Sequence, residues 1–175
     1  SYPNTTKKIL NNINLKIPFG NSIGIYGDSG VGKSTLLNIF LQLLKPQSGK
    51  IILDGKDTVN FTRQWQNIMG YVPQNVYLND DTLINNIALG VTDNQINIKK
   101  LNETVKKVKL DKFVYSLNEG FQTKVGEFGD RISGGQRQRI GIARALYNDP
   151  QILILDEYTN SLDKETEEEI VKEVN

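Results

Sequence analysis

The residues best suited to chemistry form a glycine-rich stretch, GDSGVGKS, from Gly27 to Ser34. This stretch fits the pattern G-x-x-x-x-G-K-[ST], in which glycines let backbone N–H groups approach the phosphates of a nucleotide. Lys33 would place its charge on the β- and γ-phosphate oxygens, and Ser34 would offer a hydroxyl to Mg²⁺. Because a strand is expected before the loop and a helix after it, we interpret the stretch as a phosphate cradle and not a chance turn. The predicted nucleotide-binding residues are Gly27, Asp28, Ser29, Gly30, Val31, Gly32, Lys33, Ser34 and Thr35.

A second glycine turn lies downstream, at Ser133, Gly134 and Gly135. Apolar periodicity predicts a helix over Gly135–Tyr147, with Ser133 at or near its N-cap. An ordinary capped helix accounts for Ser133 and for one glycine. It does not account for two consecutive glycines followed by the polar run QRQR that begins at Gln136. The turn therefore has the form of a second anion-binding site.

Two adjacent acids, Asp156 and Glu157, follow the apolar run Gln151–Leu155. Such a run is typical of a fully buried parallel strand, and doubly wound sheets bind ligands at the carboxyl ends of their strands. Asp156 suits an outer-shell contact to Mg²⁺, and Glu157 suits a base that polarises an attacking water. Taken alone the pair could also cap a helix, but beside a phosphate cradle the catalytic interpretation is favoured.

The elements that must position these residues alternate between strands and helices, which predicts an α/β fold. An Asp54-Gly55 pair predicts a hairpin turn after one of the strands. From residue 80 to about residue 117 apolar side chains recur at helical spacing, which predicts a mostly helical insert followed by a loop at 120–129. Strands are predicted at 9–16, 21–26, 51–53, 68–72 and 151–155, and helices at 33–44 (buried on most sides), 135–147 and 164–174.

Composition limits the classes of function. The chain has 175 residues, which suits one domain, and its net charge of +1 does not direct it to nucleic acid or anionic lipid. It has no cysteine, so disulfides and thiol chemistry are excluded. No apolar run approaches the ~18 residues that a membrane span needs, and we expect no signal peptide before the fold. Histidine is also absent.

The chain as a whole resembles the ATP-binding cassette (ABC) nucleotide-binding domain. The stretch Ile132–Arg139 is similar to the signature of that family, with Ile132 where leucine is commoner. The resemblance implies a P-loop NTPase core with a mostly parallel sheet, an antiparallel β region near the N-terminus and an α-helical insert. It also implies a division into the first half of the core (1–78), a helical subdomain (79–132) and the signature helix with the second half of the core (133–175).

The resemblance implies further site residues. Tyr2 would stack on adenine, and Gln74 would reach Mg²⁺ and water and respond to a transmembrane partner. Asp163 lies in a loop that crosses the dimer interface in the family. The implied catalytic residues are Glu157, Gln74 and Lys33; the implied metal-binding residues are Ser34, Gln74 and Asp156; and Ser133, Gly134, Gly135 and Gln136 join the nucleotide-binding set.

The implied function is that of the motor domain of an ABC exporter, which binds and hydrolyses ATP with Mg²⁺. Two copies would close around two ATP molecules, the signature of one over the glycine loop of the other. The loop at Glu127 resembles that of exporters, in which it meets a transmembrane domain. The resemblance further implies a place at the cytoplasmic face of a membrane, no nucleic-acid partner, and a lipid, lipid-linked oligosaccharide or peptide as the exported substrate.

Alternatives and departures remain at this point. Three other functions remain open: an importer cassette, a non-transport ABC ATPase and a nucleotide sensor without turnover. The short insert and the Glu127 loop disfavour the non-transport ATPase, and the Asp156-Glu157 pair disfavours the sensor. The segment Tyr158–Asp163 differs in detail from the commoner family pattern. Hydrolysing members also carry a histidine downstream of the catalytic glutamate, which is missing here. We therefore expect a fragment cut at both ends, soluble by itself, that hydrolyses ATP poorly alone.

Overall fold

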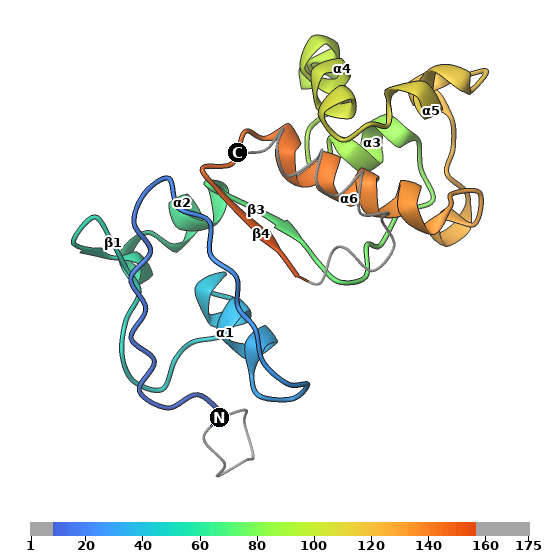
Figure 1. The fold of residues 1–175 in the computed structure, drawn as a ribbon. Coiled ribbons are helices and arrows are strands. Elements are labelled where there is room, and N and C mark those ends of the chain that lie inside the picture. The colour runs from blue at the N-terminus through green and yellow to red at the C-terminus, as the bar shows by residue number, and fades with distance from the viewer. Residues whose placement is uncertain (1–8, 157–175) are drawn as a thin grey trace. The chain divides into compact units, whose positions relative to one another are not determined.

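The computed structural model describes residues 9–156 (Figure 1). The chain divides after Gln66 into two compact units, which are described in turn. Tyr2, Glu157, Asp163 and the predicted helix at 164–174 lie outside the described residues.

The first unit contains a short helix, a hairpin and a second short helix. The hairpin turns at Asp54 and Gly55, which both have positive φ (48° and 80°), as a type I′ turn requires and as the Asp-Gly pair predicts. The elements of the first unit are α1 (Lys33–Phe40), β1 (Ile52–Leu53), β2 (Lys56–Asp57), the 3₁₀ turn η1 (Thr58–Phe61) and α2 (Thr62–Asn67).

Helix α2 holds the C-terminal end of α1. The buried Trp65 donates from Nε1 to the Phe40 carbonyl at 2.7 Å, and its ring meets the Phe40 ring edge-on with centroids 5.1 Å apart. Gln66 donates from Nε2 to the Leu41 carbonyl at 3.0 Å. These bonds satisfy carbonyls that the end of a helix leaves without partners. The prediction that this helix runs to Leu44 is wrong, because Gln42 adopts a φ of 56° and the helix ends at Phe40.

The helix is also less buried than its sequence predicts, since none of its own residues is buried within this small unit. The strands predicted at 9–16 and 21–26 are not formed; neither segment belongs to a strand of the described residues. Their apolar side chains stay largely exposed, as Leu15 (55%) and Ile23 (46%) show. A strand exists only through hydrogen bonds to a neighbour, and β1 and β2 pair only with each other in the described part of the chain.

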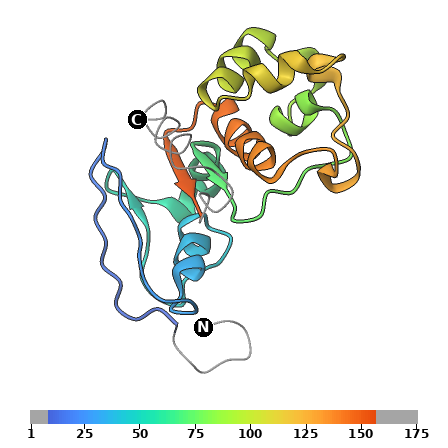
Figure 2. The ribbon, with the colours of Figure 1, turned by 45° about the vertical axis from the view of Figure 1, so that its right-hand side comes forward.

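The second unit is built on two parallel strands and one long helix. Strands β3 (Met69–Val72) and β4 (Ile152–Leu155) pair in register from Met69 opposite Ile152 to Val72 opposite Leu155. The pairing confirms the predicted parallel arrangement, but β4 is only half-buried apart from Ile154, so the prediction of a fully buried strand is wrong. Helix α6 (Gly134–Tyr147) packs against β3 on one side and against the helical insert on the other (Figures 1 and 2).

The insert between β3 and α6 is helical, as its apolar spacing predicts. Its fully buried side chains, among them Leu83, Leu101 and Val105, form one core with Ile140 and Ile142 of α6. The predicted loop at 120–129 contains two 3₁₀ turns. The elements are α3 (Leu83–Ile87), η2 (Asp93–Gln95), α4 (Ile98–Lys107), α5 (Asp111–Ser116), η3 (Gly120–Gln122) and η4 (Glu127–Gly129). No helix of residues 9–156 is long and apolar enough to cross a membrane.

Gly70 sets how closely α6 approaches β3. A Cβ at Gly70 would lie 2.7 Å from the Ala145 carbonyl oxygen and 2.9 Å from Cγ of Pro150. Backbone atoms cannot swing aside as a side-chain end can, so Gly70→Ala forces the helix away from the strand. We expect a loss of about 1–3 kcal/mol in unfolding free energy, measured by urea denaturation. An unfolding free energy of Gly70→Ala equal to that of the wild type would contradict the packing argument.

Candidate functional site

The glycine loop folds back over the lysine that follows it. Lys33 Nζ donates to the carbonyl oxygens of Gly27 at 2.6 Å and of Asp28 at 3.0 Å. Gly30 and Gly32 have φ values of 80° and 105°, a region that side chains disfavour. The loop thus curls around the Lys33 ammonium, as the sequence pattern requires.

Helix α1 begins directly at this loop, without a side-chain cap at its N-terminus. Gly32 occupies the N-cap position in a left-handed conformation, and no side chain caps the helix. No acidic residue lies in its first turn, so the positive end of the helix is not neutralised from within. Ser34 is exposed and Thr35 half-buried in that turn, while Asp28, Ser29 and Val31 are exposed along the loop. This combination is the anion-binding geometry of a helix N-terminus.

In the second unit, Gln74 and Asp156 follow the carboxyl ends of neighbouring parallel strands. The Asp156 N–H donates to the Val72 carbonyl at 3.0 Å, which extends the β3–β4 ladder by one bond. Gln74 lies two residues after Val72 and is exposed. The fold therefore brings these two predicted metal ligands to one edge of the strand pair, where open α/β sheets bind ligands.

Tyr71 is a partner of Asp156 that the motifs did not reveal. Its hydroxyl donates to Asp156 Oδ2 at 3.3 Å. Tyr71 lies opposite Ile154, so Asp156 is two residues further on the same face of the sheet. Burial, then the Asp156 charge and the hydrogen bond to it, raise the pKa of Tyr71 above its usual 10.0. No motif in the sequence signals this pair, because it depends on the register in which two distant strands meet.

The raised pKa predicts alkaline sensitivity. The folded state holds the Tyr71 proton more tightly than the unfolded state does. The contribution of Tyr71 to the unfolding free energy is therefore complete below pH 10.0 and falls as pH rises toward the folded pKa. In Tyr71→Phe this part of the decline is absent. Urea denaturation from about pH 9 to about pH 11, across the ordinary tyrosine range, measures it as a shallower slope than in the wild type. Equal slopes in the two proteins would show that Tyr71 does not titrate differently on folding.

The Ser-Gly-Gly turn caps α6 in a reciprocal arrangement. Ser133 Oγ accepts from the Gln136 N–H at 3.3 Å, and Gln136 Oε1 accepts from the Ser133 N–H at 3.0 Å. This is a capping box; the prediction named only the Ser133 cap, although the Ser-x-x-Gln spacing is the signature of the full box. The first turn of α6 contains no acidic residue. Ser133 and Gly134 are exposed, so the helix end and the Ser133 hydroxyl hydrogen remain open to an anion, while the Gln136 side chain already has a structural partner.

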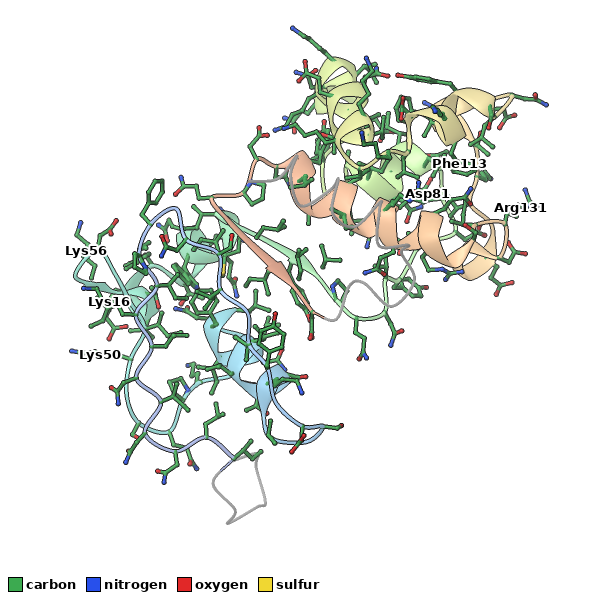
Figure 3. All side chains as sticks on the ribbon, in the orientation of Figure 1. Lys16, Lys50, Lys56, Asp81, Phe113 and Arg131 are labelled. Atoms are coloured by element: carbon green, nitrogen blue, oxygen red, sulfur yellow. The ribbon has the colours of Figure 1, made fainter. Side chains whose placement is uncertain are left out.

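The loop that carries Glu127 is anchored to the segment that follows Gln74. The Val125 N–H donates to the Asp81 carbonyl at 3.0 Å, and Asp81, labelled in Figure 3, belongs to the helical insert between β3 and α6. From the other side, Arg137 of α6 donates to the Gly129 carbonyl at 2.9 Å. Glu127 itself is exposed. The Glu127 loop is therefore tied both to the segment after β3 and to the signature helix.

The predicted site residues are thus distributed over two units. The glycine loop and α1 belong to the first unit, whereas Gln74, Asp156, the Ser133 turn and Glu127 belong to the second. Serine hydroxyl, amide and carboxylate oxygens are hard donors of the kind that Mg²⁺ prefers. Each predicted metal ligand therefore offers the type of oxygen that Mg²⁺ binds: a hydroxyl at Ser34, an amide at Gln74 and a carboxylate at Asp156.

Known proteins resemble this chain along nearly all of its length. A family profile described as ABC transporter matches residues 10–160. An ATP-dependent lipid A-core flippase of Escherichia coli is 42% identical over 171 residues, which are 97% of this chain and 29% of that protein. ABC transporter B family member 14 of Arabidopsis thaliana is 40% identical over 168 residues, 95% of this chain and 13% of that protein.

A solved structure supports the same comparison at the level of the fold. It is described as a bacterial Atm1-family ABC exporter with ATP bound, and it matches with a TM-score of 0.76 and 35% sequence identity. The match covers 83% of this chain and 26% of that one. It confirms the predicted mixed α/β fold. The chain spans less than a third of the length of each of these relatives.

Proposed function

The chain belongs to the ABC transporter family, of which it forms the ATP-binding domain, and from this premise we propose that it is the motor of an exporter. The observation that supports the proposal is that one chain contains two helix N-termini that suit an anion. One is the uncapped N-terminus of α1 behind the glycine loop, and the other is the Ser133 turn of α6. Each has the geometry for phosphate, and neither contains an acid in its first turn.

At the glycine loop, the chain would hold the β- and γ-phosphates of ATP. In the structure the Lys33 ammonium is bonded to two backbone carbonyls, Gly27 O and Asp28 O. The phosphate oxygens are stronger acceptors because they are charged, so Lys33 is positioned to exchange one carbonyl for a phosphate without leaving the loop. The N–H groups at the start of α1 would supply the remaining donors.

At the edge of the β3–β4 pair, Asp156 and Gln74 would offer oxygen ligands to Mg²⁺, and at the start of α1 the Ser34 hydroxyl would offer another. When bound, that ion neutralises charge on the β- and γ-phosphates. Tyr71 keeps the Asp156 carboxylate in place by its hydrogen bond. Glu157, the next residue, would polarise the attacking water, and Gln74 would orient it. Tyr2 would stack on the adenine ring.

The Ser133 turn would complete the site of a second copy. The Ser133 hydroxyl and the Gly135 N–H would donate to a γ-phosphate held by the partner's glycine loop, so that ATP joins two chains head to tail. Gly134 and Gln136 would line the same contact, and the Asp163 loop would cross the interface. Hydrolysis separates the γ-phosphate from the nucleotide and thereby removes the link.

Export would follow from coupling this cycle to a transmembrane domain. The exposed Gln74 and Glu127 lie on segments that are hydrogen-bonded to one another through Asp81 and Val125. They would form the surface that meets such a domain at the cytoplasmic face of the membrane. The names of the relatives, a lipid A-core flippase and an Atm1-family exporter, favour export over import and make a lipid the first substrate to test. The division into core halves 1–78 and 133–175 with a helical subdomain at 79–132 belongs to this proposal.

Release of phosphate from MgATP by the chain, compared with a Glu157→Gln variant, tests the enzymatic part of the proposal. Removal of a general base typically lowers the rate by about 10²–10⁴-fold, whereas ATP binding should be unchanged, because the carboxylate acts on water and not on the phosphates. Equal rates of phosphate release from the two proteins, above a no-protein blank, would remove Glu157 from the mechanism. A loss of ATP binding together with hydrolysis would assign it a binding role instead.

A further inference from the structure

Arg144 of α6 has all three guanidinium nitrogens bonded to the segment that follows Gln74. Nε donates to the Asn86 carbonyl at 2.8 Å, Nη1 to the Tyr77 carbonyl at 3.0 Å and Nη2 to Asn86 Oδ1 at 3.3 Å. All three acceptors are oxygens of neutral groups. A planar guanidinium fixes several acceptors in one geometry, which an ammonium cannot do. Burial also lowers the pKa of Arg144, which shows that its charge is held partly away from water.

Asn86, which receives two of these bonds, is completely buried and fully bonded. Its Nδ2 donates to the carbonyls of Asn79 and Thr82, both at 3.0 Å, and its Oδ1 accepts from the Asn79 N–H at 2.9 Å as well as from Arg144. The amide thus uses both donor hydrogens and both acceptor positions. Its orientation is fixed, because exchanging oxygen and nitrogen would set two donors against each other at Asn79. A buried network of this kind tolerates little displacement.

The same face of α6 also contacts the segment through packing. Gly141 lies one turn before Arg144, and a Cβ there would come within 2.4 Å of Val76 Cγ2. Val76 is buried and lies two residues after Gln74. The helix therefore meets the segment directly at Val76 and binds it by Arg144 at Tyr77 and Asn86. These contacts hold the chain from 76 to 79, directly or through Asn86, against α6, and Gln74 lies two residues before the first of them.

We propose that Arg144, acting through Asn86, is a positioning residue that holds Gln74 at its place by tying the segment after β3 to the signature helix. The signature turn and Gln74 lie at opposite ends of this connection, the former at the start of α6 and the latter just before Val76. A displacement of either is transmitted to the other through the same rigid contacts. The inference rests on the proposed function in one respect, namely that Gln74 is a ligand of the metal that accompanies ATP.

The first test concerns the connection alone and needs no nucleotide. Arg144→Met keeps the length of the side chain and removes every donor. In the 175-residue chain, amide hydrogen exchange at residues 76–79 should become at least tenfold faster. Arg131→Met is the matched control, because Arg131 is exposed and lies outside α6, at the right-hand edge of Figure 3. In this control, amide exchange at 76–79 should stay within twofold of the wild type. Unchanged exchange in Arg144→Met would overturn the proposal.

The second test asks whether Arg144 acts through Gln74. The affinity of the ATP-loaded chain for Mn²⁺, used as a spectroscopic substitute for Mg²⁺, is measured by electron paramagnetic resonance in wild type, Gln74→Ala, Arg144→Met and the double variant. Both single variants should lose about tenfold in Mn²⁺ affinity, the double variant should lose no more than either, and metal-free ATP affinity should stay within twofold. Arg144→Lys, which keeps the charge, should recover part of the loss, and it replaces Arg144→Met in the cycle if that variant does not fold.

The outcomes separate the two ideas. If Gln74→Ala lowers Mn²⁺ affinity and Arg144→Met does not, or if the two losses multiply in the double variant, the positioning role is overturned and the proposed function stands. If wild type binds no ATP, or if Gln74→Ala leaves Mn²⁺ affinity unchanged, the role of Gln74 in the proposed function fails. The amide hydrogen exchange of residues 76–79 then tests by itself whether Arg144 holds the segment after β3 against α6.

Discussion

Replacing Lys33 with methionine is expected to weaken ATP binding by about 100-fold or more. Hydrogen bonds to charged groups contribute about 1.5–3 kcal/mol each, and a change of about 1.4 kcal/mol is tenfold in affinity. In the structure Lys33 already lies inside the curl of the loop, bonded to Gly27 O and Asp28 O. Its ammonium therefore needs no large rearrangement to meet a phosphate. Because the side chain is already ordered without ATP, the loss of binding energy in Lys33→Met is not reduced by a smaller entropy cost of ordering that side chain.

Titration with ATP by isothermal calorimetry measures this effect. Lys50→Met is the matched control, since Lys50 is an exposed lysine of the same unit, outside the loop (Figure 3). It removes the same charge from the same unit and should leave the affinity within about twofold, because Lys50 lies outside the loop and solvent and salt screen an exposed charge. Equal losses in the two variants would mean that Lys33 acts only through net charge and would contradict the phosphate cradle.

Replacing Gly134 with aspartate is expected to abolish ATP-dependent association of two chains while leaving ATP binding by one chain unchanged. Gly134 is the first residue of α6 and is exposed. A carboxylate there would meet the γ-phosphate held by the partner, and like charges brought together across an interface cost several kcal/mol. The association constant should therefore fall by at least about 100-fold.

The substitution should not harm the helix itself. An acid in the first turn of a helix contributes about 0.3–1 kcal/mol of stability through the helix dipole, so Gly134→Asp should unfold at a denaturant concentration no lower than the wild type. Gly134→Asn has nearly the same size without the charge and should keep most of the association. Sedimentation velocity with ATP measures both variants. Equal losses in Gly134→Asp and Gly134→Asn would assign the effect to size, against the electrostatic account.

How well the sequence predicts this structure depends on how local each feature is. The glycine loop, the start of α1 at Lys33 and the cap at Ser133 are set by residues within a few positions of one another, and they form as predicted. The Asp54-Gly55 hairpin turn is equally local. The two strands at 68–72 and 151–155 were also predicted, because both segments are short apolar runs in a chain of alternating strands and helices, but which strands pair was not.

Features that depend on distant partners were missed. The strands predicted at 9–16 and 21–26 have the right alternation, but among the described residues neither segment belongs to a sheet. Helix α1 ends at Phe40, before the positive φ of Gln42, and Trp65 and Gln66 bind the carbonyls at its end, which no pattern within 33–44 reveals. The same holds for the site, where the bond of Tyr71 to Asp156 and the bonds of Arg144 to Asn86 join residues far apart in the sequence.

The central claim is that one ATP is held between the glycine loop of one copy and the Ser133 turn of another. Mixing Lys33→Met chains with Gly134→Asp chains tests it most directly, because a head-to-tail pair of the two places both defects in one site and leaves the other intact. Native mass spectrometry with ATP should find no dimer of either variant alone, and in the mixture a heterodimer that carries one ATP, against two in the wild-type dimer. A mixture that stays monomeric while the wild type dimerises with ATP, or a variant that dimerises by itself, would contradict the account.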